Sequence, residues 1–184
     1  MQKYTPNLPE GYRETNRISF SDAPSGFLPD LKVLWPGLLL ILLSLLRNHL
    51  TFGQATLSLL LFAGAIYPYF VLHELLHALV YKVASGQPVR IRFHKTGASC
   101  ALPEGYIPHQ TATLCTSAPL TVLGILLTLS ALCPHWFAFL SALLLTFHLL
   151  ACRSDIFLLR NLKKYRATDT LVQDNGTNQR IFQK

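Results

Sequence analysis

The chain of 184 residues is 51% hydrophobic and only 14% charged, with a positive mean hydropathy. This composition excludes an ordinary soluble domain, because such a domain needs a polar surface. The net charge of +7 is compatible with nucleic-acid binding, but no basic-aromatic groove or known nucleic-acid motif accompanies it. We therefore expect a membrane protein with no nucleic-acid partner.

Residues 1–30 contain four prolines and charges of both signs, but no apolar run. This pattern excludes a cleavable secretory signal in that stretch, so the first apolar segment is expected to direct the chain to the membrane. We predict that residues 1–30 form a cytoplasmic N-terminal segment.

Four later segments are apolar enough to cross a bilayer. They are approximately residues 31–46, 55–83, 111–132 and 135–159. The predicted fold is an all-α integral membrane protein with about four transmembrane helices and a small cytoplasmic β-hairpin between the second and third. Residues 31–160 would form the membrane domain, and residues 161–184 would form a cytoplasmic C-terminal tail.

Lysine and arginine are unevenly distributed among the segments that connect these spans. The N-terminal segment, the loop after the second span and the C-terminal segment are rich in them, whereas the other two loops contain only Arg47. This alternation follows the positive-inside rule and predicts that both termini are cytoplasmic. Membrane lipids are thus expected partners.

The second span contains the sequence His-Glu-Leu-Leu-His at residues 73–77. On a helix, His73 and His77 project from the same face, about 6 Å apart in rise, so both imidazoles can bind one metal ion. Glu74 is placed to accept a proton from water activated by zinc and to pass it to a leaving amine. The alternative is a pair of packed or hydrogen-bonded histidines. An ionisable residue such as Glu74 within a span favours the functional interpretation.

A catalytic zinc usually has three protein ligands and one water, so two histidines leave one ligand to be found. The fourth predicted span contains Asp155 near its cytoplasmic end. The second and fourth spans both run from outside to inside, which places Asp155 at a depth similar to that of His73 and His77. Asp155 is therefore our predicted third ligand.

Two other residues of the fourth span remain as alternatives. His148 is about 10.5 Å from Asp155 along a straight helix, so the two cannot bind the same ion. His148 is therefore an alternative to Asp155 as the ligand, or a group one layer deeper that contacts the substrate or the ligands. Cys152 could replace Asp155, although a packed thiol is the simpler interpretation. Asp155 itself could instead pair with Arg153 or Arg160.

The loop between the second and third spans alternates apolar and polar residues on both sides of a Lys-Thr-Gly turn, which predicts a hairpin. Its strand edge could bind an extended peptide beside the metal, or the hairpin could merely cover the helix ends. The C-terminal tail carries Asn-Gly between two short alternating runs, so it could form a second hairpin or lie on anionic lipid. Asp169 and Asp174 are expected in turns.

The four cysteines at positions 100, 115, 133 and 152 are widely separated, without a Cys-x-x-Cys pair. This spacing indicates neither a zinc knuckle nor a disulfide framework. We expect free thiols, most of them buried.

Three stretches together resemble a known family. With "HELLHA", "PEGYIPHQTATLCTSAP" and "RSDIFLLRNLKK", the chain resembles the putative zincin peptidase family of small bacterial membrane proteins, a domain of unknown function. The resemblance extends from about Tyr67 to the C-terminus. More distantly, the chain is similar to the site-2 proteases, which are intramembrane zinc enzymes.

The resemblance implies zinc bound by His73, His77 and Asp155, with Glu74 as the base, and it implies a bacterial cytoplasmic membrane. The chain departs from the site-2 protease pattern at Ile156, where those enzymes commonly have glycine, and it lacks their preceding Asn-x-x-Pro.

The sequence thus predicts a membrane-embedded zinc metalloprotease that hydrolyses a peptide bond of a membrane or membrane-proximal protein substrate. The competing hypothesis is a non-catalytic membrane protein that binds metal through the same His/Asp site, or serves as a scaffold. A closed shell of four ligands, completed by His148 or Cys152, would favour the second hypothesis.

Overall fold

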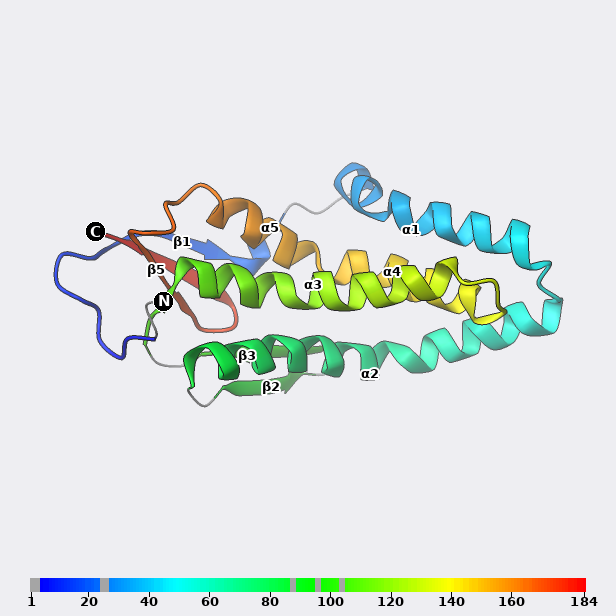
Figure 1. The fold of residues 1–184 in the computed structure, drawn as a ribbon, viewed down its shortest axis with the longest axis horizontal. Coiled ribbons are helices and arrows are strands. Elements are labelled where there is room, and N and C mark those ends of the chain that lie inside the picture. Colours follow the sequence, from blue (N-terminus) through cyan, green and yellow to red (C-terminus); the bar gives the residue numbers. More distant parts are fainter. Residues whose placement is uncertain (1–3, 24–26, 87–88, 95–96, 103–104) are drawn as a thin grey trace. The chain divides into compact units, whose positions relative to one another are not determined.

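The computed structural model describes residues 4–23, 27–86, 89–94, 97–102 and 105–184. Within these residues helices dominate, and short strands lie at both ends of the chain and between the second and third helices (Figure 1). The helices are α1 (Phe27–Asn48), α2 (Phe52–Ser85), α3 (His109–Leu132), α4 (Phe137–Ala151), α5 (Arg153–Leu162) and a 3-10 turn (Phe20–Asp22). The strands are β1 (Arg13–Ser19), β2 (Arg90–His94), β3 (Gly97–Ala101), β4 (Ile107–Pro108), β5 (Thr170–Asp174) and β6 (Asn178–Gln183).

The chain divides into two compact units, and each is described by itself. The first unit consists of Met1–Ala23, Phe70–Pro119 and Ser154–Lys184, and the second consists of Pro24–Tyr69 and Leu120–Arg153. We refer to them as the sheet unit and the helical unit.

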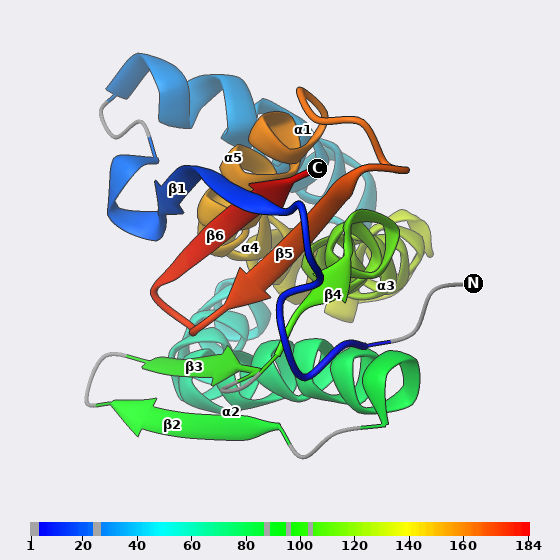
Figure 2. The ribbon, with the colours of Figure 1, turned by 90° about the vertical axis from the view of Figure 1, so that its left-hand side faces the viewer.

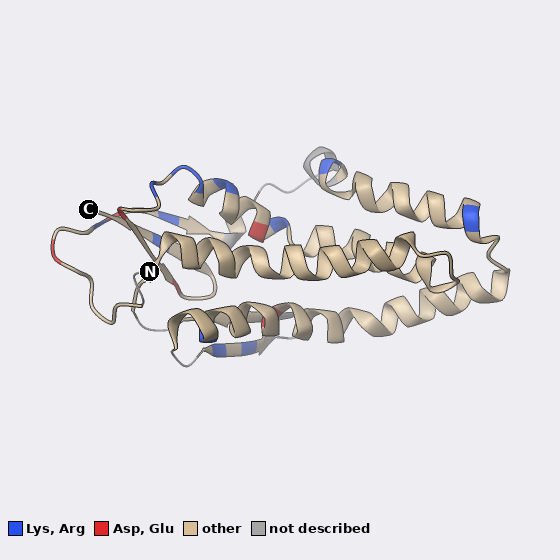
Figure 3. Cartoon of the chain, viewed as in Figure 1, with Lys and Arg blue, Asp and Glu red and all other residues tan. Residues whose placement is uncertain are grey.

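Three helices are long and apolar enough to cross a membrane, namely α1 from Leu31, α2 and α3. Helices α4 and α5 meet this criterion only together, as one span broken at Cys152. Helices α3 and α4 contain no lysine, arginine, aspartate or glutamate (Figure 3). Three of the about four predicted spans are therefore present as apolar helices, and the predicted fourth span is two helices that meet at a bend.

Local sequence signals fix the ends of α2. Thr51 and Gln54 form a reciprocal capping box, in which the Gln54 N–H donates to Thr51 Oγ1 and the Thr51 N–H donates to Gln54 Oε1. Gly86 has a φ of +71° and donates its N–H to the Lys82 carbonyl, as a glycine just past a helix end commonly does. The 34-residue helix between them carries the His-Glu-Leu-Leu-His motif.

The helical unit is held by close packing of α1 against α4. A Cβ atom added to Gly37 would lie 2.8 Å from the Cα of Thr146, so only glycine fits at this crossing. At the other end of α1, the Arg47 guanidinium donates to the carbonyls of Leu132 and Cys133. Arg47 thereby satisfies carbonyls at the C-terminus of α3, where the helix dipole favours a positive charge.

The sheet unit contains a four-stranded antiparallel sheet in the order β1-β6-β5-β4 (Figure 2). The N-terminal segment contributes one edge through β1, and Thr5 also forms a bridge to Tyr106 next to β4. The sheet therefore joins strands from both ends of the chain to a strand that directly precedes α3.

This sheet shows that the all-α prediction was wrong. The strand β1 has the sequence RETNRIS, of which only Ile18 is buried, so it lacks the alternation that marks a strand in a sequence. The strand β4 has only two residues. Both strands exist because of long-range pairing with the C-terminal hairpin, which no local pattern reports.

Both hairpins considered from the sequence are present. The strands β2 and β3 pair antiparallel between the second and third helices, with Ile91 opposite Cys100. The strands β5 and β6 pair through the turn that contains Asn175 and Gly176, and Gly176 has the positive φ that such a turn requires.

The core of the sheet unit joins the sheet to helices α2, α3 and α5. Its fully buried members come from every one of these elements: Ile107, Ala112, Cys115, Leu158, Leu162, Val172 and Ile181, together with Tyr81 at 3% exposure. This core fixes the positions of the helix segments that carry the candidate site.

Candidate metal centre

Helix α2 presents its two motif histidines to one point. The Nε2 atoms of His73 and His77 lie 3.2 Å apart, with the rings edge to face. Because the residues are four apart, one helical turn separates them and both rings leave the same face. His73 is buried and His77 is nearly so.

Helix α5 brings Asp155 to the same point. Its Oδ2 lies 3.2 Å from Nε2 of His73, and its Oδ1 lies 3.6 Å from Nε2 of His77. The break after α4 places Asp155 in the first turn of the new helix α5. The three residues predicted as ligands therefore lie close enough together to bind one metal ion, and all three belong to the sheet unit.

Helix α3 orients His77 through its backbone. Nδ1 of His77 lies 2.8 Å from the carbonyl oxygen of Cys115. A carbonyl only accepts, so Nδ1 carries the proton in this bond and the lone pair of Nε2 faces Asp155 and His73. Metal-binding histidines are commonly held in this way.

These donor atoms fit a zinc ion. Atoms bound to a tetrahedral zinc at about 2.0–2.1 Å lie roughly 3.3 Å from one another, and the observed separations are 3.2 and 3.6 Å. Oδ2 of Asp155 is buried and accepts no hydrogen bond from the described residues. A buried carboxylate oxygen without a donor is unfavourable, and a cation at this point would satisfy it.

Glu74 lies beside this centre and has its own backbone partner. The N–H of Cys100, on β3, donates a hydrogen bond to the Glu74 carboxylate. Glu74 is half-buried, and its carboxylate is close enough to His73, His77 and Asp155 to interact with all three charges. The hairpin predicted from the sequence therefore contacts the predicted base.

Residues 66–169 match the model of a protein family described as "Putative zincin peptidase". The chain belongs to this family. The matched stretch includes the two histidines, Glu74 and Asp155, and the family's description points to a zinc-dependent peptidase. No curated protein and no solved structure gives a significant match.

His148 and Cys152, the alternative ligands, belong to the helical unit of this zincin-family chain. Nδ1 of His148 lies 2.6 Å from the hydroxyl of Tyr69, and the Cys152 thiol lies 3.6 Å from the same nitrogen. Gly124 leaves room for the imidazole, since an added Cβ would lie 3.5 Å from Nε2. Both side chains are buried.

Several residues next to the candidate site had no role in the sequence analysis. Cys100 and Cys115 contribute through their backbone groups, which carry no side-chain signal. Burial raises the pKa of the Cys100 thiol, which keeps it protonated and inert. Tyr81 could have been noticed, because it lies four residues after His77 and therefore on the same helix face.

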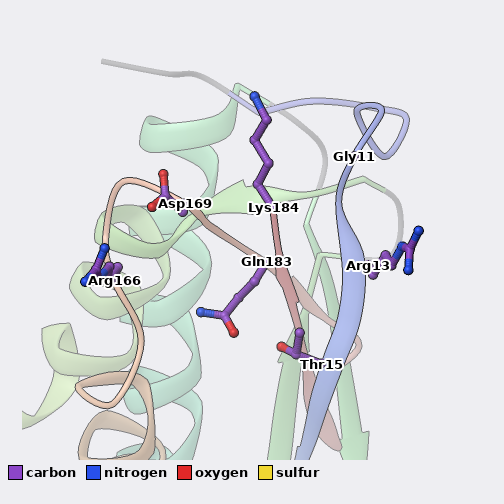
Figure 4. A pocket seen from close by; sticks show the side chains of 7 residues that line it. All are labelled: Gly11, Arg13, Thr15, Arg166, Asp169, Gln183 and Lys184. Carbon is purple, nitrogen blue, oxygen red and sulfur yellow. The ribbon is translucent and has the colours of Figure 1, made fainter.

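A separate hollow of about 630 Å³ lies elsewhere in the sheet unit (Figure 4). It is lined by Gly11, Arg13, Thr15, Arg166, Asp169, Gln183 and Lys184. This lining has one carboxylate and no histidine or cysteine, so it offers no ligand set for zinc. The candidate metal centre is therefore the cluster on α2 and α5.

Proposed function

We propose that this zincin-family chain is a membrane-embedded zinc metalloprotease that hydrolyses a peptide bond of a membrane or membrane-proximal protein. The observation that carries the proposal is the convergence of the His73, His77 and Asp155 donor atoms, with Glu74 adjacent in the chain. Two neutral imidazoles and one carboxylate leave a fourth position for water, as catalytic zinc sites do.

His73, His77 and Asp155 would hold the metal. Zinc bound there would polarise the substrate carbonyl and make a water molecule acidic enough to act as the nucleophile near neutral pH. Glu74 would accept the proton of this water and transfer it to the leaving amine. The Cys115 carbonyl would keep the Nε2 lone pair of His77 directed at the metal position.

The strand β3 supports a role in substrate binding. Its Cys100 N–H is directed at Glu74, so an extended peptide paired with the hairpin of β2 and β3 would bind close to the base. The alternative role of the hairpin is to cover the end of α2. In either role, the hairpin limits how water and peptide reach Glu74.

The setting of the reaction is part of the proposal. The distribution of lysine and arginine favours cytoplasmic termini and a site reached by water from the cytoplasmic side of the membrane. The family resemblance implies that this membrane is bacterial. Lipids and a membrane protein or peptide are the proposed partners. The position of both histidines on the long apolar helix α2 supports cleavage within or next to the bilayer.

The test compares the wild-type chain with Glu74→Gln in the same membranes. Zinc per chain is measured in each purified protein, and the membrane proteomes of cells that contain one or the other are compared. We expect zinc in both proteins, because Glu74 is not a ligand. At least one membrane protein should be shortened only in cells with the wild type.

Two outcomes would contradict the proposal. Zinc in both proteins with identical proteomes would favour the non-catalytic metal-binding or scaffold protein. Absence of zinc from both proteins would indicate that the histidines and Asp155 only pack against one another and bind no metal.

A further inference from the structure

The C-terminal hairpin carries a buried carboxylate close to the metal centre. Asp174, at the end of β5, is 4% exposed. Its Oδ2 accepts hydrogen bonds from the Tyr81 hydroxyl at 2.5 Å and from Gln179 Nε2 at 3.0 Å, and its Oδ1 accepts the Gly176 N–H at 2.9 Å. The bond to Gly176 is the turn interaction expected from the sequence. The bonds from Tyr81 and Gln179 connect Asp174 to residues outside the turn.

The bond to Tyr81 reaches the helix that carries the histidines. Tyr81 is one helical turn beyond His77 and lies on the same face of α2. It is 3% exposed, so its hydroxyl is enclosed together with Asp174. The Asp174–Tyr81 bond therefore fixes the rotation of α2 about its axis one helical turn after His77.

The backbone of Asp174 reaches the strand that contacts the base. Its carbonyl accepts the N–H of Leu102 at 3.1 Å, and Leu102 lies two residues after Cys100, whose N–H donates to Glu74. The hairpin turn also packs directly on this strand, because a Cβ added to Gly176 would lie 3.1 Å from the Cys100 carbonyl oxygen.

A third connection reaches the helix that orients His77. Gln179, which donates to Asp174, also donates to Thr116 Oγ1 at 3.4 Å. Thr116 follows Cys115, whose carbonyl accepts the Nδ1 proton of His77. Asp174 is thus connected to each of the three segments that determine where His77 and Glu74 point.

We propose that Asp174 is a positioning residue for the metal centre, whose carboxylate acts through Tyr81 and Gln179 to set the geometry of His77 and Glu74. The inference rests on the proposed function, since it concerns the same centre. The C-terminal hairpin supplies none of the predicted ligands. The inference gives it a role in metal affinity and coordination geometry. A turn aspartate that only stabilised the hairpin would affect neither property in the folded protein.

The test uses the full chain with Asp174→Asn, Tyr81→Phe and the matched control Asp169→Asn. Asp169 precedes β5 and lines the separate hollow, so its variant makes the same charge change at a residue that does not bond Tyr81 or Gln179. Zinc affinity is measured by competition with a chelator. The visible absorption of the Co²⁺-substituted protein reports the coordination geometry, and thermal unfolding reports the folded fraction.

We expect Asp174→Asn to weaken zinc binding about 10-fold or more, within the range for groups that support metal ligands, and to change the Co²⁺ spectrum. Tyr81→Phe should change both in the same direction by a smaller factor, and Asp169→Asn should match the wild type. If the wild type binds zinc, and if Asp174→Asn and Tyr81→Phe both keep its zinc affinity and Co²⁺ spectrum, this inference is wrong. The proposed function would not be affected by that result. If Asp174→Asn does not fold, an unchanged Tyr81→Phe overturns it. Absence of zinc from the wild type would instead overturn the proposed function, and this inference with it.

Discussion

Nε2 of His77 lies 3.6 Å from Oδ1 of Asp155, although the two residues belong to different helices separated by two others. The opposite ring nitrogen of His77 is fixed by the Cys115 carbonyl. His77 is therefore held on one side by α3 and directed on the other side at α5. This arrangement leads to the first of four predictions.

Replacing Asp155 by Asn should weaken zinc binding by more than about 100-fold, because loss of a ligand exceeds the effect of supporting groups. The amide cannot supply the negative charge that two neutral imidazoles lack. Chelator competition on the purified chain measures the change. Glu74→Gln, which leaves all three proposed ligands intact, is the control, and equal zinc affinity in both variants would exclude Asp155 as a ligand.

Alanine substitutions at two glycines of the apolar helices α1 and α2 should change stability in opposite directions. Gly37→Ala should destabilise the protein by about 1–3 kcal/mol, because the new Cβ would press on the Thr146 backbone. Gly64→Ala should stabilise it by about 0.5–1 kcal/mol, since an added Cβ there meets nothing within 4 Å and alanine favours helix. Thermal unfolding in detergent compares them. Equal effects would mean that the contact between α1 and α4 does not restrict Gly37.

Cys133 should be the reactive cysteine of this chain. It is exposed, whereas Cys100, Cys115 and Cys152 are buried. If the turn after α3 faces outward, as the positive-inside pattern predicts, a membrane-impermeant maleimide added to intact cells will label the chain once. Cys133→Ser should abolish this labelling. Labelling only after the membrane is opened would reverse the predicted orientation.

Glu14→Gln should remove a pH-dependent part of the stability of the sheet. The hydrogen bond from Arg180 lowers the pKa of Glu14 below its ordinary value of 4.5. Because the folded-state pKa is the lower one, this stabilisation is present above about pH 4.5 and is lost as the pH falls through the folded-state pKa. The melting temperature of the wild type should exceed that of Glu14→Gln near neutral pH, and the difference should disappear in acid.

The matched control is Glu10→Gln, which removes the same charge from an exposed side chain outside the sheet. A difference between wild type and Glu14→Gln that stayed constant down to about pH 3 would show that the Arg180 pair does not couple sheet stability to the protonation of Glu14.

Features that depend on local chemistry could be predicted from the residues alone. Apolar runs of sufficient length predicted the long apolar helices, and the spacing of His73 and His77 placed two imidazoles on one helix face. The charge pattern further limited the search for a third ligand to the cytoplasmic end of the last span, and Asp155 was selected there. Alternation around a turn signal was enough to predict the hairpin of β2 and β3.

Features that depend on pairing between distant segments become visible only in the folded chain. The polar sequence of β1 becomes a strand because β6 supplies its hydrogen bonds. The break at Cys152 begins a new helix at Arg153, in whose first turn Asp155 faces the two histidines. The groups that orient the site, the Cys115 carbonyl and the Cys100 N–H, are backbone atoms that every residue has. Their partners are set by packing, so no residue type in the sequence could reveal them.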